Sequence, residues 1–355
     1  MYNNNYQGKN MIKIAFYDTK AYDIPSFEKY GKERGIEFKF FDSMLNEDTV
    51  MLANGFDGVC VFVNDTVNEA VIDKLYEIGI KLILLRCAGF NNVDIKAAYG
   101  KIHVYRVPGY SPYAVAEHAM AMLLTMNRRI HKAYIRTREY NFSLNGLTGV
   151  DLYGKTMGVV GTGKIGQIFV NICKGFGMRV IAFDKFPNPN IDVEYVELNE
   201  LFKRSDFISL HCPLSDENRH MINKKSMEMM KKGVGIINTS RGGLIDAKDL
   251  LDEIKERKIG FAALDVYEEE TNIFFQDKSG HILDDDILRS LIAMPNILIT
   301  SHQAFLTEEA LHNIADTTTQ NILNHFAEQG DVQNEICYHC ERINTCRRER
   351  NKKCF

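Results

Sequence analysis

One stretch of the sequence, Thr156-Met-Gly-Val-Val-Gly161-Thr-Gly163-Lys-Ile-Gly166, joins a short apolar run to three glycines spaced as G-x-G-x-x-G. Between a strand and a helix, the first glycine permits a tight turn and the second lets the backbone approach a pyrophosphate. The third lets the helix pack on the strand, while the helix N-terminus faces the phosphates. The stretch therefore predicts a dinucleotide-binding fold that continues into a helix over residues 164–176.

An acidic residue follows this motif at the expected separation. Asp184 lies eighteen residues beyond Gly166, at the end of the next apolar run. A carboxylate there accepts hydrogen bonds from the adenosine ribose and repels a 2′-phosphate, which favours NAD over NADP, although the neighbouring Lys185 leaves some binding of NADP open. The alternative, three glycines in unrelated turns with Asp184 in another turn, does not account for strand, loop, helix and acid in register.

Short β-branched runs alternate with amphipathic segments on both sides of this stretch. The runs begin near residues 12, 37, 58, 81 and 103 in one series and near 156, 179, 207, 235, 261 and 297 in the other. This alternation predicts an α/β protein with two doubly wound parallel sheets, covered by helices and flanking one crevice. Two prolines in Pro108-Gly-Tyr-Ser-Pro112 can continue neither a strand nor a helix, so we expect a hinge there.

Two helices are expected at positions that bear on assembly and domain order. The segment from Tyr113 to Arg138 is expected to form one long helix, apolar around much of its circumference. Either a subunit interface or a central place within its domain would cover such a helix. A last helix is expected over 306–326 with no strand after it, and shorter helices near 24–34, 66–79 and 92–100.

Composition excludes several classes of protein. The 355 residues are 45% hydrophobic and 25% charged, which is typical of a globular chain with two domains. A net charge of -4 gives no reason to expect nucleic acid or an anionic membrane as the main partner. No apolar run reaches the roughly 18 residues of a transmembrane helix, and the polar start has no apolar signal-peptide core. We therefore expect a cytoplasmic protein whose residues 1–10 are a flexible extension.

Eight cysteines divide into two groups. Cys60, Cys87, Cys173 and Cys212 lie in apolar or strand-end contexts, where reduced thiols are expected in the cytosol. The other four lie between residues 337 and 355, in a basic segment. Their spacings match no zinc module, so we predict no metal site and expect residues 339–355 to form a flexible extension.

Three reactive side chains each follow an apolar run of the sequence: Arg241, Glu270 and His302. Singly, each has a structural explanation, since Arg241 could pair with Asp246, Glu270 could belong to a solvated acidic face, and His302 could be a satisfied strand-end histidine. The carboxyl ends of parallel strands converge on one edge, so we expect the three to act together. His118, His211 and His220 lack a comparable carboxylate partner nearby in the sequence.

A guanidinium clamps a planar carboxylate, an imidazolium protonates an oxyanion, and a carboxylate orients the imidazole. Together the three groups suit the reduction of a 2-keto acid. The segments that carry these three groups resemble the D-isomer-specific 2-hydroxyacid dehydrogenases. The resemblance extends over this chain from Met11 to about Tyr338. The family resemblance is carried by Lys155–Gly166, Asn238–Asp246, Asp265–Glu270 and Ser301–Thr307. The more specific matches within the family are Leu85–Asp94, Ala116–Ala119, Asn127–His131, Asn141–Gly149 and Phe274–Ser279.

The resemblance implies an architecture. A flavodoxin-like substrate domain would be discontinuous, consisting of residues 11–110 and 306–338, and a Rossmann NAD-binding domain would span residues 111–305. Hinges would lie near 108–112 and 301–307. It also implies a homodimer or tetramer formed through the helix that starts near Pro112.

The resemblance also implies roles for individual residues. Arg241 would bind the substrate carboxylate, and His302, paired with Glu270, would be the general acid for the keto oxygen. The backbone at Ala88 and Gly89 would help to hold the carboxylate. Tyr110 and Phe305 would flank the methyl group, and the cofactor would contact Gly161, Gly163, Lys164, Ile165, Gly166, Asp184, Cys212, Pro213, Thr239 and Asp265.

The implied activity is the NADH-dependent reduction of pyruvate to D-lactate, and the D stereochemistry is implied by the resemblance alone. Two alternatives stay open. The same chemistry could serve a bulkier 2-keto acid, phosphoglycerate or glyoxylate, although no basic cluster near Ala88 or Tyr110 suits a substrate phosphate. The chain could instead be an NAD-sensing scaffold of the corepressor kind, because a fold does not determine a function.

Overall fold

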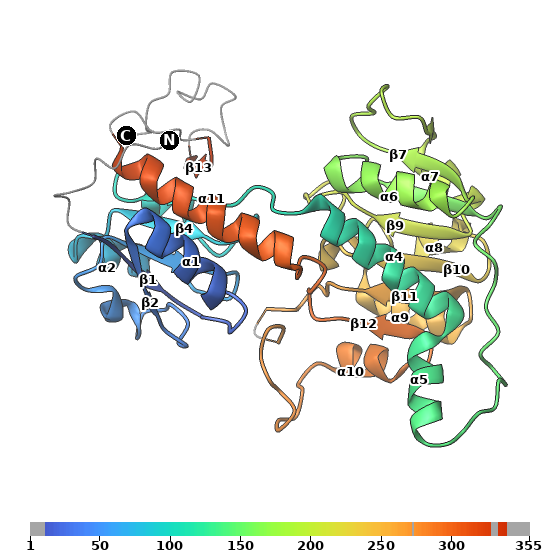
Figure 1. Cartoon of the computed structure of the whole chain (residues 1–355). Helices are drawn as coiled ribbons and strands as arrows, with labels where there is room; N and C mark the ends of the chain where they lie inside the picture. Colours follow the sequence, from blue (N-terminus) through green and yellow to red (C-terminus); the bar gives the residue numbers. More distant parts are fainter. Residues whose placement is uncertain (1–10, 272, 328–332, 339–355) are drawn as a thin grey trace. The chain divides into compact units, whose positions relative to one another are not determined.

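Residues 11–271, 273–327 and 333–338 are described by the computed structural model of the chain, which divides into two units (Figure 1). Unit 1 extends to Ser111 and takes up the chain again from Thr307, and unit 2 is Pro112–Leu306. The extensions expected at 1–10 and 339–355, with three of the four tail cysteines, lie outside the described residues. The five described cysteines are in no disulfide.

Unit 1 is built on a six-stranded sheet in the order β13-β5-β4-β3-β1-β2. Strands β1 to β5 are parallel and follow the flavodoxin-like order 2-1-3-4-5, so the expected doubly wound class is confirmed for this unit. The strands are β1 (Ile12–Phe16), β2 (Ile36–Phe40), β3 (Gly58–Val61), β4 (Leu82–Leu85), β5 (His103–Tyr105) and β13 (Glu335–Ile336).

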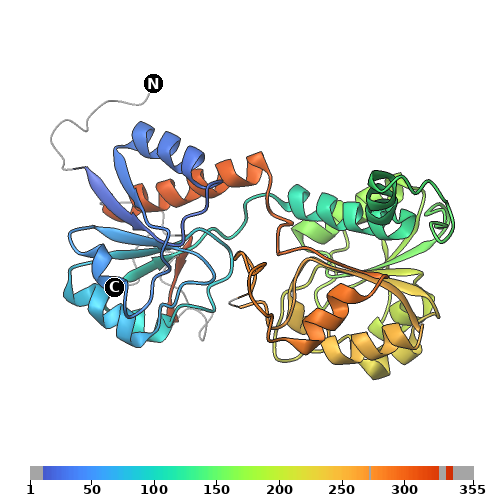
Figure 2. The ribbon, with the colours of Figure 1, turned by 90° about the horizontal axis from the view of Figure 1, so that it is seen from below.

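Helices cover both faces of this sheet, and β3 and β4 are fully buried as a result. In unit 1, α1 and α11 lie side by side on one face, and α2 and α3 contact each other on the other face (Figures 1 and 2). The helices are α1 (Ile24–Arg34), the 3-10 helix η1 (Val50–Ala53), α2 (Glu69–Glu77), α3 (Ile95–Ala98) and α11 (Glu308–Phe326).

The expectation that no strand follows the last helix is wrong. After α11 the chain forms β13, which pairs antiparallel with β5 at the edge of the sheet. The strand has two residues, too few to show an apolar pattern in the sequence. Its pairing is fixed by a non-local contact, since His103 Nδ1 lies 2.6 Å from the buried Glu335 Oε1.

Unit 2 is built on a seven-stranded parallel sheet in the order β12-β11-β10-β9-β6-β7-β8. Counted from β6, this is the Rossmann order 3-2-1-4-5-6 with one further strand at the edge, which confirms the expected class. The strands are β6 (Thr156–Val160), β7 (Arg179–Phe183), β8 (Glu194–Tyr195), β9 (Phe207–Leu210), β10 (Val234–Asn238), β11 (Ile259–Leu264) and β12 (Ile297–Ile299).

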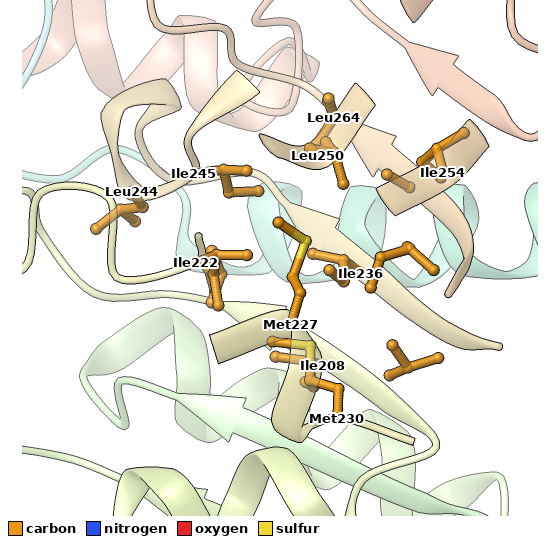
Figure 3. Close-up of a cluster of buried hydrophobic side chains, with 14 of the residues drawn as sticks. Ile208, Ile222, Met227, Met230, Ile236, Leu244, Ile245, Leu250, Ile254 and Leu264 are labelled. Carbon is orange, nitrogen blue, oxygen red and sulfur yellow. The ribbon is translucent and has the colours of Figure 1, made fainter. Parts of the chain in front are cut away.

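Two hydrophobic cores lie on the two faces of this sheet. One is formed with α4 and α6, and the other with α7 to α10; part of the second is shown in Figure 3, where Ile208, Ile236 and Met227 meet. The helices are α4 (Pro112–Arg128), α5 (Ile130–Arg138), α6 (Lys164–Gly175), α7 (Leu198–Arg204), α8 (Lys224–Met229), the 3-10 helix η2 (Gly242–Leu244), α9 (Ala247–Lys255) and α10 (Asp286–Ala293).

The long helix expected from Tyr113 to Arg138 is two helices. Arg129 adopts a left-handed conformation with φ of 51° between α4 and α5, and no proline or glycine marks this break in the sequence. α4 is largely buried, whereas α5 buries none of its residues. Among the described residues, no helix combines the length and the hydropathy needed to cross a membrane.

Candidate active site

The three glycines after β6 each have a distinct environment. Gly161 has φ of 94°, and a Cβ there would lie 2.7 Å from the Cys212 nitrogen, so only glycine permits this approach of two loops. A Cβ on Gly166 would lie 2.0 Å from the Gly161 oxygen, which shows how closely α6 packs on the turn. A Cβ on Gly163 would meet nothing within 4 Å. Open space therefore lies beside the N-terminus of α6, the position at which the motif would hold a pyrophosphate.

Asp184, directly after β7, is held as an ionised acceptor. It accepts hydrogen bonds from the Thr162 nitrogen at 2.6 Å, the Thr162 hydroxyl at 2.9 Å and the Phe186 nitrogen at 2.8 Å. Burial opposes ionisation, but these bonds outweigh it and lower the pKa of Asp184. Lys185 pairs with Glu217 at the exposed surface. Thr162 was not among the residues predicted from the sequence, although it lies inside the glycine motif.

Beyond β9 and β10, two loops come together beside the glycine turn. The Ser240 hydroxyl donates to the Cys212 carbonyl at 2.5 Å, and the Asn218 amide donates to the Pro213 carbonyl at 2.8 Å. The Thr239 hydroxyl is buried and has no hydrogen-bond partner among the described residues. A buried hydroxyl without a partner is costly, so Thr239 offers a position that a bound polar group would satisfy.

His302 and Glu270 form the pair expected from the sequence. His302 Nδ1 lies 2.8 Å from Glu270 Oε1, and the Tyr267 N–H donates to Glu270 Oε2 at 3.0 Å. A carboxylate only accepts, so Nδ1 carries the proton in this contact and Nε2 is the nitrogen left for a substrate. The Phe275 ring lies 5.9 Å from the His302 ring. Both members of the pair keep about a quarter of their side-chain surface exposed (24% each).

The backbone at His302 is in the left-handed region, with φ of 53°. Such a conformation costs about 1 kcal/mol or more and persists only where the surroundings enforce it. Asp265, fully buried after β11, enforces it. Its carboxylate accepts from the Thr300 hydroxyl at 2.5 Å and from the Gln303 and Ala304 nitrogens at 2.9 Å, and its carbonyl accepts from the His302 nitrogen at 2.7 Å.

Asp265 is also an anion in this environment. Burial opposes its ionisation, but the His118 ring, the Thr300 hydroxyl and the two backbone N–H groups together lower its pKa. His118 Nε2, on α4, lies 3.4 Å from Asp265 Oδ1. The sequence suggested Asp265 as a neighbour of the cofactor, and in the structure both of its oxygens are engaged by donors of the protein itself.

Arg241 follows β10, and its guanidinium is not consumed by the fold. Nη1 donates to the Ser240 carbonyl at 2.7 Å, and among the described residues Arg241 forms no ion pair. The alternative partner Asp246 instead caps α9 and lies 3.5 Å from His220 Nδ1. A half-buried guanidinium without a carboxylate partner is suited to bind a carboxylate of a ligand.

His118 and His220, which have no comparable carboxylate partner nearby in the sequence, each have one in the structure. His118 contacts Asp265, and His220 Nε2 lies 2.8 Å from Glu268 Oε1. Both partners are distant in the sequence and are brought close only by the sheet. His211 has no such partner in the described chain; it contacts the Ser209 hydroxyl at 2.9 Å, and burial lowers its pKa to about 3.

The residues expected around the substrate belong to different units. Ala88 and Gly89 follow β4 in unit 1, where the Ala88 carbonyl accepts from Arg106 at 3.1 Å. The Tyr110 carbonyl, also in unit 1, accepts from the Asn313 amide at 2.6 Å. Phe305 is buried in unit 2, three residues after His302. Unit 2 alone therefore brings together Arg241, Glu270, His302 and the glycine loop.

Comparison with known proteins gives consistent matches. A family model described as "D-isomer specific 2-hydroxyacid dehydrogenase, NAD binding domain" matches residues 120–304. A "2-hydroxyacid dehydrogenase homolog" of Haemophilus influenzae is 53% identical over 315 residues, which are 88% of this chain and 95% of the relative. The "D-lactate dehydrogenase" of Escherichia coli strain K12 is 53% identical over 325 residues, or 90% and 98%. The apo structure of D-lactate dehydrogenase from Escherichia coli aligns with a TM-score of 0.85 at 50% identity, covering 92% and 100%.

Proposed function

The chain belongs to the D-isomer specific 2-hydroxyacid dehydrogenases, with NAD as the cofactor, and we propose that it reduces pyruvate to D-lactate. One observation carries the proposal most strongly. At the carboxyl ends of the unit 2 strands, a guanidinium without a carboxylate partner accompanies a histidine whose Nδ1 is held by a glutamate. The name of the Escherichia coli relative supports lactate as the product.

Each side chain has a defined task in this proposal. Arg241 binds the keto-acid carboxylate through its planar fork. His302 Nε2 donates a proton to the keto oxygen, while Glu270 holds the ring through Nδ1 and stabilises its protonated form. NADH, when bound, would supply the hydride. The open space at Gly163, the ionised Asp184 and the partnerless Thr239 hydroxyl fit this cofactor.

Unit 1 is assigned to the substrate in this proposal, and residues 11–110 with 306–338 form that domain. The backbone at Ala88 and Gly89 assists with the carboxylate, and Tyr110 and Phe305 flank the methyl group. The absence of a disulfide at the five described cysteines supports a cytosolic location, where thiols stay reduced.

A homo-oligomer is the second part of the proposal. α5 buries none of its side chains, although a nine-residue helix is marginal without packing. Its residues Ile130, Tyr134 and Ile135 are more than half exposed, and the exposed apolar series continues beyond it with Tyr140, Phe142 and Leu144. A second copy of the chain would cover this face. Light scattering should show a dimer or tetramer for the wild type and a smaller species for Ile135→Asp, and a wild-type monomer would contradict this part.

The activity is tested by steady-state NADH oxidation with a panel of 2-keto acids. We expect pyruvate to give the highest kcat/KM, above bulkier 2-keto acids and glyoxylate. NADPH should be much poorer than NADH, because the Asp184 carboxylate repels a 2′-phosphate. Preference for another acid would retain the chemistry and change the substrate. Tight NADH binding without turnover of any acid would instead favour the NAD-sensing scaffold.

A further inference from the structure

The turn Tyr267–Glu270 presents two glutamates to two different histidines. Glu270 contacts His302 Nδ1 at 2.8 Å. Glu268, two residues earlier, faces His220, whose Nε2 lies 2.8 and 2.9 Å from its two carboxylate oxygens. Glu268 also accepts from Arg219, and its side chain is only 15% exposed. The turn that carries Glu270 is therefore anchored by a second glutamate and histidine pair as well.

His220 is itself fixed to the loop that carries Arg241. The backbone N–H of His220 donates to the Gly243 carbonyl at 2.8 Å, and its backbone carbonyl accepts from the Asn223 side-chain amide at 2.8 Å. Its backbone has φ of 52°, and its Nδ1 lies 3.5 Å from Asp246 Oδ2. The groups that face the His220 ring are thus two carboxylates, Glu268 and Asp246.

The Arg241 loop and the Glu270 turn also touch directly. A Cβ on Gly242 would lie 2.0 Å from the Tyr267 carbonyl carbon and 2.3 Å from the Glu268 nitrogen. A shift of the Glu268 backbone would therefore press on the residue next to Arg241. Three loops, after β9, β10 and β11, form one connected assembly at this contact, and His220 joins all three.

We propose that His220 and Glu268 are positioning residues, which hold the turn that carries Glu270 in register and thereby orient the His302 ring for proton donation. The inference rests on the proposed function, since it concerns the same reaction. Neither residue has to touch substrate. A misplacement of about 1 Å at a catalytic group can lower a rate by about 100-fold, so an anchor two residues from Glu270 has leverage on the chemistry.

The test is a set of variants with a matched control. His220→Gln and Glu268→Gln remove the charged contact and keep similar side-chain volume. We expect each to lower kcat for keto-acid reduction about tenfold and to leave NADH affinity within about twofold. The reduction rate should fall as pH is raised, and the midpoint of this fall should lie at lower pH in both variants. The reason is that a displaced Glu270 stabilises the imidazolium form of His302 less. His281→Gln, at an exposed histidine of the same unit, should change none of these.

A double-mutant comparison separates positioning from general stability. If His220 acts through Glu270, His220→Gln should cost about tenfold in kcat in the wild type and less than about twofold in Glu270→Gln. A purely structural role would cost the same factor in both backgrounds and would overturn the inference. An unchanged kcat and pH profile in the wild-type background would overturn it as well. If one single variant fails to fold, the other carries the comparison.

A readout without turnover distinguishes this inference from the proposed function. The His302 ring signal, identified by its loss in His302→Gln, is followed by NMR across pH in the wild type, His220→Gln and Glu268→Gln. We expect its titration midpoint to be lower in both variants. Equal midpoints would overturn the inference even in an active enzyme, whereas a wild type that reduces no 2-keto acid would overturn the proposed function alone.

Discussion

Each unit carries an arginine just beyond the carboxyl end of an interior parallel strand: Arg86 directly follows β4, and Arg241 lies three residues after β10. Arg86 is 2% exposed. It donates to Asp23 at 3.2 Å and to the carbonyls of Tyr17 and Asp18 at 3.1 and 2.6 Å. Its guanidinium also lies over the Phe16 ring and over the Phe62 ring. Arg241 has one backbone acceptor and, among the described residues, no carboxylate.

The comparison shows that the carboxyl edge of a parallel sheet gathers polar groups in both units, but among the described residues the guanidinium of Arg86 has a carboxylate partner and that of Arg241 has none. In unit 1 the buried guanidinium is neutralised and hydrogen-bonded by its own fold, as a buried charge must be. In unit 2, Arg241 is half-buried and has no carboxylate partner among the described residues, which is why we propose that a ligand carboxylate supplies one. The position of an arginine in the fold is therefore a weaker sign of function than whether its guanidinium already has a carboxylate partner.

The pKa values of buried and half-buried aspartates also differ between the two units. Burial raises the pKa of Asp23 and Asp65 in the cluster around Arg86, against the opposing effect of the guanidinium. In unit 2, hydrogen bonds outweigh burial and lower the pKa of Asp184 and Asp265. The acids beside the candidate active site are thus held ionised by backbone and hydroxyl donors.

The largest expected effect is at His302 of unit 2, the proposed proton donor. His302→Gln should lower the rate of keto-acid reduction by about 10²- to 10⁴-fold, because the proton donor is lost. Oxidation of the hydroxy acid should fall similarly, and NADH binding and the thermal midpoint should change little. Kinetics and fluorescence titration of NADH measure the two quantities. Retention of more than a tenth of the activity would show that another group donates the proton.

The next effect is on the stability of unit 1. Arg86→Met leaves Asp23 buried without its counter-ion, and such a break costs about 3–5 kcal/mol. Hydrogen exchange should accelerate in β1 and β3 and remain unchanged in β6 and β10. The matched variant Arg241→Met should leave exchange unchanged in both units. Equal destabilisation by the two variants would remove the distinction between the two arginines.

A smaller effect is expected for the conservative change at Arg241, the proposed binding position for the substrate carboxylate. Arg241→Lys keeps the charge and loses the planar fork, so kcat/KM for the keto acid should fall by roughly 10- to 100-fold. NADH affinity should stay near the wild-type value. A collapse of cofactor binding would instead give Arg241 a structural role.

The smallest effect concerns the pH dependence of stability. Burial raises the pKa of Asp65 from 3.8 to about 6, although Arg86 and two backbone N–H groups oppose it. The folded state then binds a proton that the unfolded chain has released, so unit 1 loses stability as pH rises from 3.8 to about 6. Asp65→Asn should flatten this part of the profile, measured as thermal midpoint against pH. A profile as steep as that of the wild type would contradict the assignment.

Asp265 in unit 2, whose pKa is lowered, should give the opposite dependence of stability on pH. The stability that Asp265 contributes is present above its unfolded value of 3.8 and is lost as pH falls through its lower folded value. Asp265→Asn should therefore be most destabilising near neutral pH and approach the wild type in acid. A constant difference between the two proteins across pH would contradict this linkage.

The sequence was sufficient for much of the fold, because the apolar runs of the parallel strands are continuous and the glycine motif fixes its own context. It was insufficient where non-local contacts decide. Arg129 breaks a helix without a proline or glycine, and β13 is too short to show a pattern. In the site, Glu270 and His302 were expected to act together and their contact is observed, whereas the contact of Glu268 with His220 joins segments distant in the sequence and only the structure reveals it.

The most direct test of the account follows the hydride itself. Pyruvate is reduced with NADH that carries deuterium at nicotinamide C4, prepared in each of the two epimers, and the lactate is analysed by mass spectrometry and chiral chromatography. We predict one deuterium at C2 of D-lactate from one epimer and none from the other. Lactate without deuterium from either epimer, or L-lactate as the product, would contradict the account.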